Sequence, residues 1–291
     1  MPTHASRYRP DAPPDYSHRF HAGNVGDVWK HCALVVLLAR AARDGRRVAF
    51  IDTHAGEGRY RLGPTGEWTE GIGRLWTDAG ADADPSVAAY RALVRRLADG
   101  GERPHVYPGS PLFARAVLGA GTPLHLWEHD PAACERLRGH CASDAAVHIT
   151  CGDGLAGLAA AIAAAESASD ATVVLIDPPW AQKADWTLVP DALAQAASRS
   201  KCASLVLWYP VKSLTRPNAM MARLEKAGVS ASLVELLTTP LAHQRQRLNG
   251  SGLLLVRPPD GALAALGAAG TALGERCATR PGAWSMRLVS W

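Results

Sequence analysis

Residues 172–180 read Thr-Val-Val-Leu-Ile-Asp-Pro-Pro-Trp, an apolar run that stops at an acidic residue and two prolines. An unbroken run of branched apolar residues is typical of a strand that is buried on both faces, as in a parallel sheet. Two prolines can neither join a sheet ladder nor continue a helix. The stretch therefore predicts a central strand over Thr172–Ile176, with Asp177 and the Pro178 carbonyl projecting from the sheet edge.

Six similar apolar runs recur along the chain and alternate with stretches of helical spacing. This alternation predicts an α/β fold with a seven-stranded, mostly parallel, doubly wound sheet and helices on both faces. The expected strands are Val48–Ile51, Leu124–Trp127, Val147–Thr150, Thr172–Ile176, Ser204–Trp208, Ser232–Leu237 and Leu253–Val256. The expected helices include Asp27–Arg43, Ser86–Asp99, Pro111–Leu118, Pro131–Cys141, Leu155–Ala165, Pro190–Ser200 and Asn218–Ala227.

The spacing of the first two strands is irregular. About seventy residues separate them, whereas a simple βαβ unit needs roughly thirty. We therefore expect a small helical insertion subdomain over residues 61–108, within one domain formed by residues 16–60 and 109–291. The insertion is equally compatible with a wall of a substrate cleft and with an inert addition. Residues 1–15 are polar and rich in proline, which predicts a disordered leader.

Composition and charge narrow the class of protein. The chain is 47% hydrophobic and 20% charged, as in an ordinary globular protein, and no apolar run reaches membrane-spanning length. Its six cysteines lack zinc-ligand spacing, which predicts reduced thiols in a cytoplasmic protein without a metal. Residues 1–61 hold 10 basic and 6 acidic side chains, residues 62–200 hold 10 and 17, and residues 201–291 hold 11 and 4. Basic ends fit a nucleic-acid partner, although scattered solvated charge would look the same.

Small and acidic residues follow the first three expected strands. The turn at 52–58 reads Asp-Thr-His-Ala-Gly-Glu-Gly, Glu128 follows the second strand, and Asp153-Gly154 follows the third. Glycines let a backbone approach a ligand, and a carboxylate at Glu128 can accept both hydroxyls of a ribose. Each residue alone could be a turn or a helix cap. Together, at one sheet edge, they predict a nucleoside cofactor. The spacing is not the G-x-G-x-x-G of NAD sites, and His54 would crowd a pyrophosphate.

The Asp-Pro-Pro-Trp segment fits the methylation of an aromatic amine. The lone pair of an adenine N6 amine is conjugated into the ring, so the amine is a poor nucleophile. The Asp177 carboxylate and the Pro178 carbonyl can accept its two hydrogens and localise that lone pair, while Trp180 can stack on a base taken out of its helix. A sulfonium methyl group then needs only in-line placement. The alternative is a Pro-Pro loop with a packing tryptophan.

Several motifs together resemble one family, the J-type methyltransferases that modify adenine N6 in 23S rRNA. The likeness runs from about Tyr16 to the C-terminus. The motifs that carry it are Tyr16–Asn24, Asp27–His31, Asp52–Gly56, Tyr107–Pro111, Ile176–Pro179 and Leu207–Val211. The family usually has tyrosine where this chain has Trp180, which keeps stacking and removes a hydroxyl. The leader before Tyr16 is also longer than usual.

The resemblance implies a Rossmann-like methyltransferase fold, S-adenosyl-L-methionine as cofactor with S-adenosyl-L-homocysteine as product, a 23S rRNA substrate, and a monomer. It implies a catalytic group in which Asp177 is the carboxylate, joined by Pro178, Trp180, Lys30 and His18, and it implies substrate binding by Tyr16. The implied cofactor-binding residues are His31, His54, Ser110, Glu128, Asp153 and Gly154. From the residues alone, His18 and His31 would be ordinary surface or capping histidines, and Lys30 a solvated helix residue.

Three other functions remain open from the sequence. A DNA adenine-N6 methyltransferase would share Asp177 to Trp180 but usually carries a larger recognition domain than this insertion. An NAD-dependent oxidoreductase would share only the fold, and a non-catalytic RNA-binding relative would tolerate loss of Asp177. Basic residues suited to RNA phosphates occur in two places. They are the segment 243–250, with His243, Arg245, Arg247 and Asn249, and the residues Lys212, Arg216 and Arg223.

Overall fold

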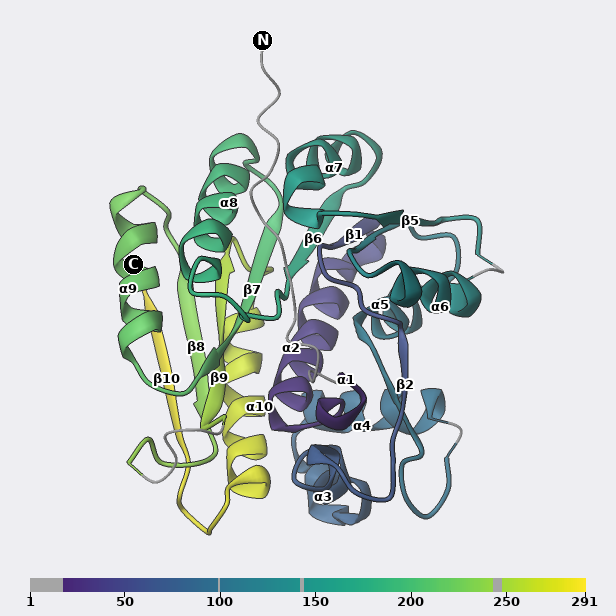
Figure 1. Cartoon of the computed structure of the whole chain (residues 1–291), viewed down its shortest axis with the longest axis vertical. Coiled ribbons are helices and arrows are strands. Elements are labelled where there is room, and N and C mark those ends of the chain that lie inside the picture. Colours follow the sequence, from purple (N-terminus) through teal and green to yellow (C-terminus); the bar gives the residue numbers. More distant parts are fainter. Residues whose placement is uncertain (1–17, 99, 142–143, 243–247) are drawn as a thin grey trace.

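Eight strands form one sheet in the computed structural model, which describes residues 18–98, 100–141, 144–242 and 248–291 (Figure 1). The leader expected over residues 1–15 lies outside these ranges. The strands are β1 (Val48–Asp52), β4 (Leu124–Glu128), β5 (Val147–Cys151), β6 (Ala171–Ile176), β7 (Ser204–Val211), β8 (Ser232–Leu237), β9 (Gly250–Val256) and β10 (Ser285–Ser290). Their order is β10-β8-β9-β7-β6-β1-β4-β5.

The stretch at 172–180 lies in the middle of this sheet. β6 pairs in parallel with β1 on one side and with β7 on the other. The parallel arrangement continues through β4 to β5, whereas β9, β8 and β10 add antiparallel strands beyond β7. Residues 172–176 are all buried. The expected α/β fold with a mostly parallel sheet is confirmed.

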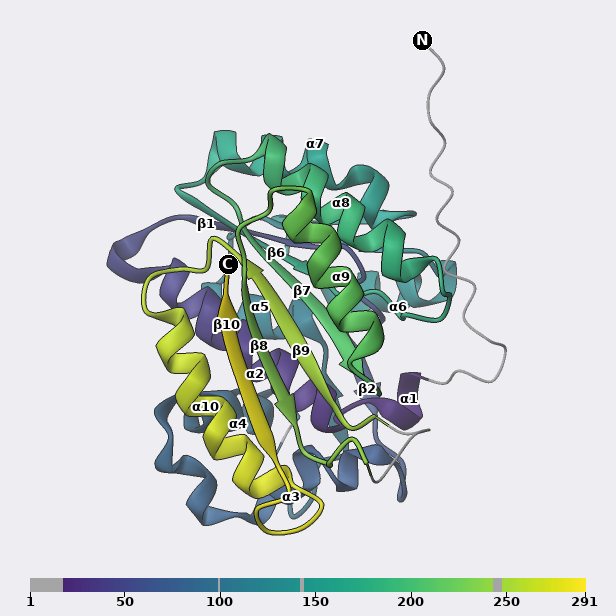
Figure 2. The same ribbon diagram turned by 90° about the vertical axis from the view of Figure 1, so that its left-hand side faces the viewer.

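Helices cover both faces of the sheet, as Figure 2 shows from the side. Successive strand side chains point to opposite faces, and Val173 and Val174 accordingly belong to two separate apolar cores. The core that contains Val173 also contains α2 (Val25–Ala41), α4 (Pro85–Leu97), α5 (Ser110–Leu118) and α10 (Ala262–Cys277). The core that contains Val174 contains α7 (Gly154–Ala168), α8 (Asp185–Arg199) and α9 (Thr215–Lys226). The remaining helices are α1 (His18–His21), α3 (Ile72–Thr77), α6 (Pro131–Cys141) and the 3-10 turns η1 (Arg43–Gly45), η2 (Glu67–Thr69) and η3 (Ala79–Ala83).

The structure corrects the expected elements at three places. The sheet has eight strands rather than seven, because β10 is an edge strand with mostly exposed side chains and no apolar run. The helix before this strand, α10, was not among the expected helices. It is rich in alanine and glycine, so the sequence of α10 shows little contrast between an apolar and a polar side. α8 begins at Asp185 rather than at Pro190, and the proline lies inside the helix.

A short antiparallel ribbon brackets the segment expected as an insertion. β2 (Arg59–Arg61) pairs with β3 (Val106–Pro108), which brings the two ends of the segment together. Between them lie η2, α3, η3 and α4, and α4 packs against α2 and α10. The segment therefore contains helices in addition to its two-stranded ribbon. That it forms a separate subdomain stays a prediction.

Candidate active site

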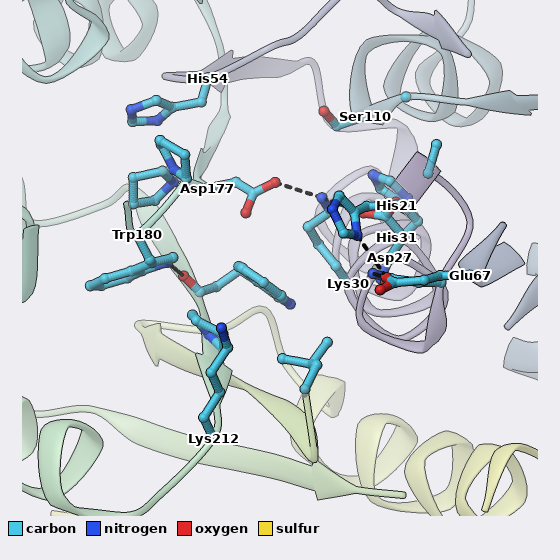
Figure 3. A pocket seen from close by; sticks show the side chains of 18 of the residues that line it. His21, Asp27, Lys30, His31, His54, Glu67, Ser110, Asp177, Trp180 and Lys212 are labelled. Carbon is cyan, nitrogen blue, oxygen red and sulfur yellow. Dashed lines mark hydrogen bonds and ion pairs between the residues drawn. The ribbon is translucent and has the colours of Figure 1, made fainter. Parts of the chain in front are cut away.

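A cavity of about 590 Å³ lies at the carboxyl ends of β1, β6 and β7 (Figure 3). Asp177 directly follows β6, and His54 follows β1 by two residues. Because parallel strands end at the same edge of a sheet, both residues lie at this edge. Helices α2 and α5 contribute side chains from across this edge. The predicted site residues that line the cavity are Lys30, His31, His54, Ser110, Asp177, Pro178 and Trp180.

A buried lysine joins two carboxylates in this cavity. The Lys30 Nζ lies 2.5 Å from Asp177 Oδ2 and 2.8 Å from Asp27 Oδ1, and Figure 3 shows the first pair as a dashed line. Burial alone would lower the pKa of Lys30, but Asp177 and Asp27 outweigh it and raise this pKa above its ordinary value. Lys30 is therefore charged. The ammonium of Lys30 thus lies between two carboxylates at this end of the cavity.

Asp27 is held in place by the start of α2. Its Oδ2 accepts a hydrogen bond from the Gly23 backbone N–H at 2.9 Å, and its own N–H donates to Asn24 Oδ1, the cap of the helix. The Asn24 amide in turn donates to Glu67 Oε2 at 2.9 Å, and His21 Nδ1 lies 2.9 Å from the same oxygen. Glu67 belongs to η2, so a residue of the 61–108 segment anchors the chain beside the site. Neither Asp27 nor Glu67 was predicted as a site residue, although Asp27 begins the motif Asp27–His31.

A second buried carboxyl lies at the end of β1. The Ser110 hydroxyl donates to Asp52 Oδ2 at 2.6 Å, and the His54 backbone N–H donates to Asp52 Oδ1 at 3.1 Å. Asp52 is fully buried, and burial raises its pKa to about 7 despite these two hydrogen bonds. From the sequence, Asp52 was expected only as part of the turn at 52–58 and not as a site residue. Its place at the end of a strand is the signal that could have identified it.

The two predicted cofactor histidines are both neutral. Burial lowers the pKa of His31 to about 3 and that of His54 to about 4. His31 Nδ1 lies 2.9 Å from the Tyr107 hydroxyl, which lies 2.9 Å from the Tyr90 hydroxyl. The His31 ring also stacks on Phe113. His31 is thus fixed by buried residues from β3, α4 and α5, and neutral imidazoles can act here as hydrogen-bonding groups without adding charge.

Three predicted cofactor residues lie apart from this cavity lining. Glu128 ends β4, and its Oε2 accepts from the Gly56 backbone N–H at 2.8 Å. Asp153 caps α7 by accepting from the first backbone N–H groups of that helix. A Cβ atom on Gly154 would lie 2.2 Å from the Thr53 carbonyl oxygen, so only glycine fits there. Glu128 and Gly154 therefore both contact the turn that follows β1.

Trp180 is packed more tightly than a substrate-stacking ring requires. Its side chain is only 7% exposed, its Nε1 donates to the Trp208 carbonyl oxygen at 3.1 Å, and its ring centroid lies 4.3 Å from that of Trp186. Its φ of 52° is unusual for a residue with a side chain. Trp208 lines the cavity as well, with Lys30 Nζ 5.6 Å from its ring centroid. That Trp180 stacks on a base stays a prediction.

The other predicted residues are dispersed. Tyr16 and the basic residues His243, Arg245 and Arg247 lie outside the described ranges, and His18 opens α1. Asn249 is fully buried and its amide donates to a backbone carbonyl, so it does not face RNA. Within the described ranges, no helix is long and apolar enough to cross a bilayer, and no three His, Cys, Asp or Glu side chains form a metal-binding group.

Comparisons with known proteins agree on one family. The model of the RsmJ family, described as ribosomal RNA large subunit methyltransferase D, RlmJ, matches residues 46–290. The chain is 34% identical over 250 residues to the ribosomal RNA large subunit methyltransferase J of Haemophilus influenzae. The aligned region covers 84% of this chain and 87% of that relative. The methyltransferase J of Escherichia coli is 33% identical with the same coverage.

A solved structure supports the likeness in three dimensions. A Legionella pneumophila protein superimposes with a TM-score of 0.84 and 26% sequence identity, over 93% of this chain and 98% of that one. Lys30 and Asp27 precede the residues that the family model matches.

Proposed function

The chain belongs to the RsmJ family of ribosomal RNA large subunit methyltransferases, and we propose that it methylates the N6 amine of one adenine in 23S rRNA, with S-adenosyl-L-methionine as cofactor. The family resemblance given by the sequence motifs is thereby confirmed. The observation that carries the proposal is the pairing of Lys30 with Asp177, directly before Pro178, at the wall of the cavity.

Asp177 and Pro178 bind the amine. The Lys30 ammonium holds one oxygen of the Asp177 carboxylate and favours its ionised form. The carboxylate and the Pro178 carbonyl accept the two amine hydrogens, so that the nitrogen lone pair points away from both acceptors. The adenine enters the cavity flipped out of its helix, where a methyl group in line with the lone pair can be transferred directly.

The charge of the site suits this reaction. The amine becomes cationic as its nitrogen takes up the methyl group, and fixed charges act strongly in a site from which water is excluded. The Asp177 carboxylate, with Lys30 and Asp27 beside it, lies where this positive charge develops. We assign to Lys30 and Asp27 the role of holding the catalytic carboxylate in place.

The residues around the turn after β1 fit the cofactor. Glu128 can accept ribose hydroxyls, Asp153 can accept from an adenine amine, and the absence of a side chain at Gly154 allows close backbone packing there. His31, His54 and Ser110 then lie at the cavity. S-adenosyl-L-methionine supplies the activated methyl group and leaves as S-adenosyl-L-homocysteine. From the N-terminal segment, Tyr16 is proposed to bind the substrate and His18 to belong to the catalytic group.

One experiment tests the proposal. The protein is incubated with methyl-labelled S-adenosyl-L-methionine and 23S rRNA, 16S rRNA or duplex DNA, and the modified base is mapped. We expect N6-methyladenine in 23S rRNA. Label on duplex DNA alone would indicate a DNA methyltransferase, and no label on any nucleic acid would favour a non-catalytic RNA-binding protein.

A pair of variants locates the chemistry. Asp177→Ala should abolish transfer and leave the cofactor Kd nearly unchanged in calorimetry. Asp170→Ala is the matched control, because Asp170 precedes the same strand at its opposite end, where it pairs with Arg47 on the surface. A large loss of cofactor binding in Asp177→Ala would mean that Asp177 belongs to the cofactor site instead.

A further inference from the structure

Two basic residues line the cavity on the side of β7 and α9. Lys212 directly follows β7, and Arg216 lies in the first turn of α9. Figure 3 shows the Lys212 side chain extending from the end of its strand toward the space below Asp177, on the side away from His54 and Ser110. The cavity therefore extends from the catalytic carboxylate to a basic wall.

These two cations differ from the other basic residues nearby. Lys30 is paired with two carboxylates, and Arg223, on the same helix as Arg216, forms a bidentate pair with Asp191. Neither Lys212 nor Arg216 has a carboxylate within ion-pair distance in the part of the chain that the structure describes. Uncompensated positive charge in a cavity raises the local concentration of anions.

An aromatic ring stands beside the basic wall. The Arg216 guanidinium lies 5.9 Å from the ring centroid of Trp186, and Trp186 packs on Trp180. All three residues line the cavity. Tryptophan faces next to lysine and arginine match the two parts of a nucleotide, because rings contact bases and cations contact phosphates.

We propose that Lys212 and Arg216 bind the phosphodiester group next to the target adenosine. This inference rests on the proposed function. Arginine can bind a phosphate through two parallel hydrogen bonds, and lysine adds a compact charge. With the phosphate held at the basic wall and the amine held at Asp177, both ends of the nucleotide are fixed and the base is oriented for methyl transfer.

The test removes the charge from the RNA phosphate in one set of samples and from the basic side chain in another. The substrate is a 23S rRNA fragment that contains the target adenosine, either unmodified or with one uncharged methylphosphonate at its 5′ or its 3′ linkage. The variants are Lys212→Ala, Arg216→Ala, the two combined, and the control Lys226→Ala, whose exposed side chain lies on the same helix but does not line the cavity. Methyl transfer and equilibrium binding are both measured for each combination.

On unmodified RNA, Lys212→Ala and Arg216→Ala should each lower kcat/KM by about tenfold to a hundredfold, the range for a hydrogen bond to a charged group. Each should also reduce the slope of log K against log salt by about one. Lys226→Ala should change little. With the methylphosphonate at the contacted linkage, the wild-type protein should become as poor as the double variant Lys212→Ala/Arg216→Ala, and the double variant should lose nothing further. Each single variant should lose less than the wild-type protein does.

If the losses in kcat/KM caused by Lys212→Ala and by the methylphosphonate are additive at both linkages, the proposal is overturned, because Lys212 would then act without touching either phosphate. An equal loss in Lys226→Ala would overturn it too, since general surface charge would explain the effect. Failure of the proposed function is distinguishable, because the wild-type protein would then transfer no methyl group to adenine in the unmodified fragment. RNA binding by the variants would still decide the phosphate contact in that case.

Discussion

Replacing Asp52 by asparagine should stabilise the protein at neutral pH. Asp52 is fully buried, and its pKa moves from 3.8 to about 7 on folding, mainly through burial. A tenfold change in proton affinity corresponds to about 1.4 kcal/mol. The ionised carboxylate therefore weakens folding by about 4 kcal/mol at most. An asparagine can accept from the His54 N–H and donate to the Ser110 hydroxyl, so the two hydrogen bonds of this site can persist.

The pH dependence gives this prediction its sign. Below pH 4, Asp52 is protonated in both folded and unfolded chains and contributes no difference. Between pH 4 and 7 the unfolded chain loses this proton while the folded chain keeps it, so the wild-type protein loses stability as the pH rises. Asparagine does not titrate. The stability gain of Asp52→Asn should thus grow from pH 4 to 7 and then level off.

Urea unfolding of both proteins at pH 5, 6, 7 and 8 measures this gain. A gain that is independent of pH, or a loss at every pH, would refute the reasoning, because Asp52 would then not carry an elevated pKa. Calorimetry on the same samples measures cofactor affinity. We expect it to fall in the variant, since the cofactor is cationic and Asp52 contacts Ser110, a proposed cofactor residue.

Three further substitutions test the packing of the site. Lys30→Met leaves two partly buried carboxylates without their cation and should lower the free energy of unfolding in urea, by about 3–5 kcal/mol at most. A loss below about 1 kcal/mol would mean that the ion pair contributes little. Gly154→Ala forces a Cβ atom against a backbone oxygen and should lower stability by about 1–3 kcal/mol and weaken cofactor binding in calorimetry; unchanged values for both would contradict the close packing. Trp180→Phe removes the indole N–H bond and should reduce unfolding free energy by about 1 kcal/mol, whereas no change would show that this bond is unimportant.

The central elements were predictable because their signals are local. β6 is a branched apolar run that ends at two prolines, and its position and burial follow from those residues alone. By contrast, α10 is buried against the sheet through small residues, and small residues give little periodic contrast in a sequence. β10 is exposed on its outer side, so pairing with β8 rather than hydrophobicity makes it a strand.

The contacts of the candidate site were harder to predict than its residues. Lys30 and Asp177 are far apart in the sequence, and no spacing rule relates them; only the fold places one on the other. The resemblance pointed to both residues without their ion pair. Trp180 was predictable as an aromatic beside the site, but its packing on Trp186 and its bond to Trp208 depend on tertiary structure.

The burial of α2 has a consequence for the order of folding. Thirteen of its 17 residues are buried, and its partners include α5, β6, β9 and α10. Figure 1 shows the helix in the middle of the molecule. α2 precedes every strand of the sheet in the sequence, whereas β9 and α10 follow nearly all of them. A growing chain therefore carries an apolar helix without its cover until synthesis is almost complete. Lys30 reaches Asp177 only through a contact of high sequence separation, and such contacts form slowly. The enzyme's active site should accordingly be among the last parts of the protein to assemble, and the nascent chain a ready client for chaperones.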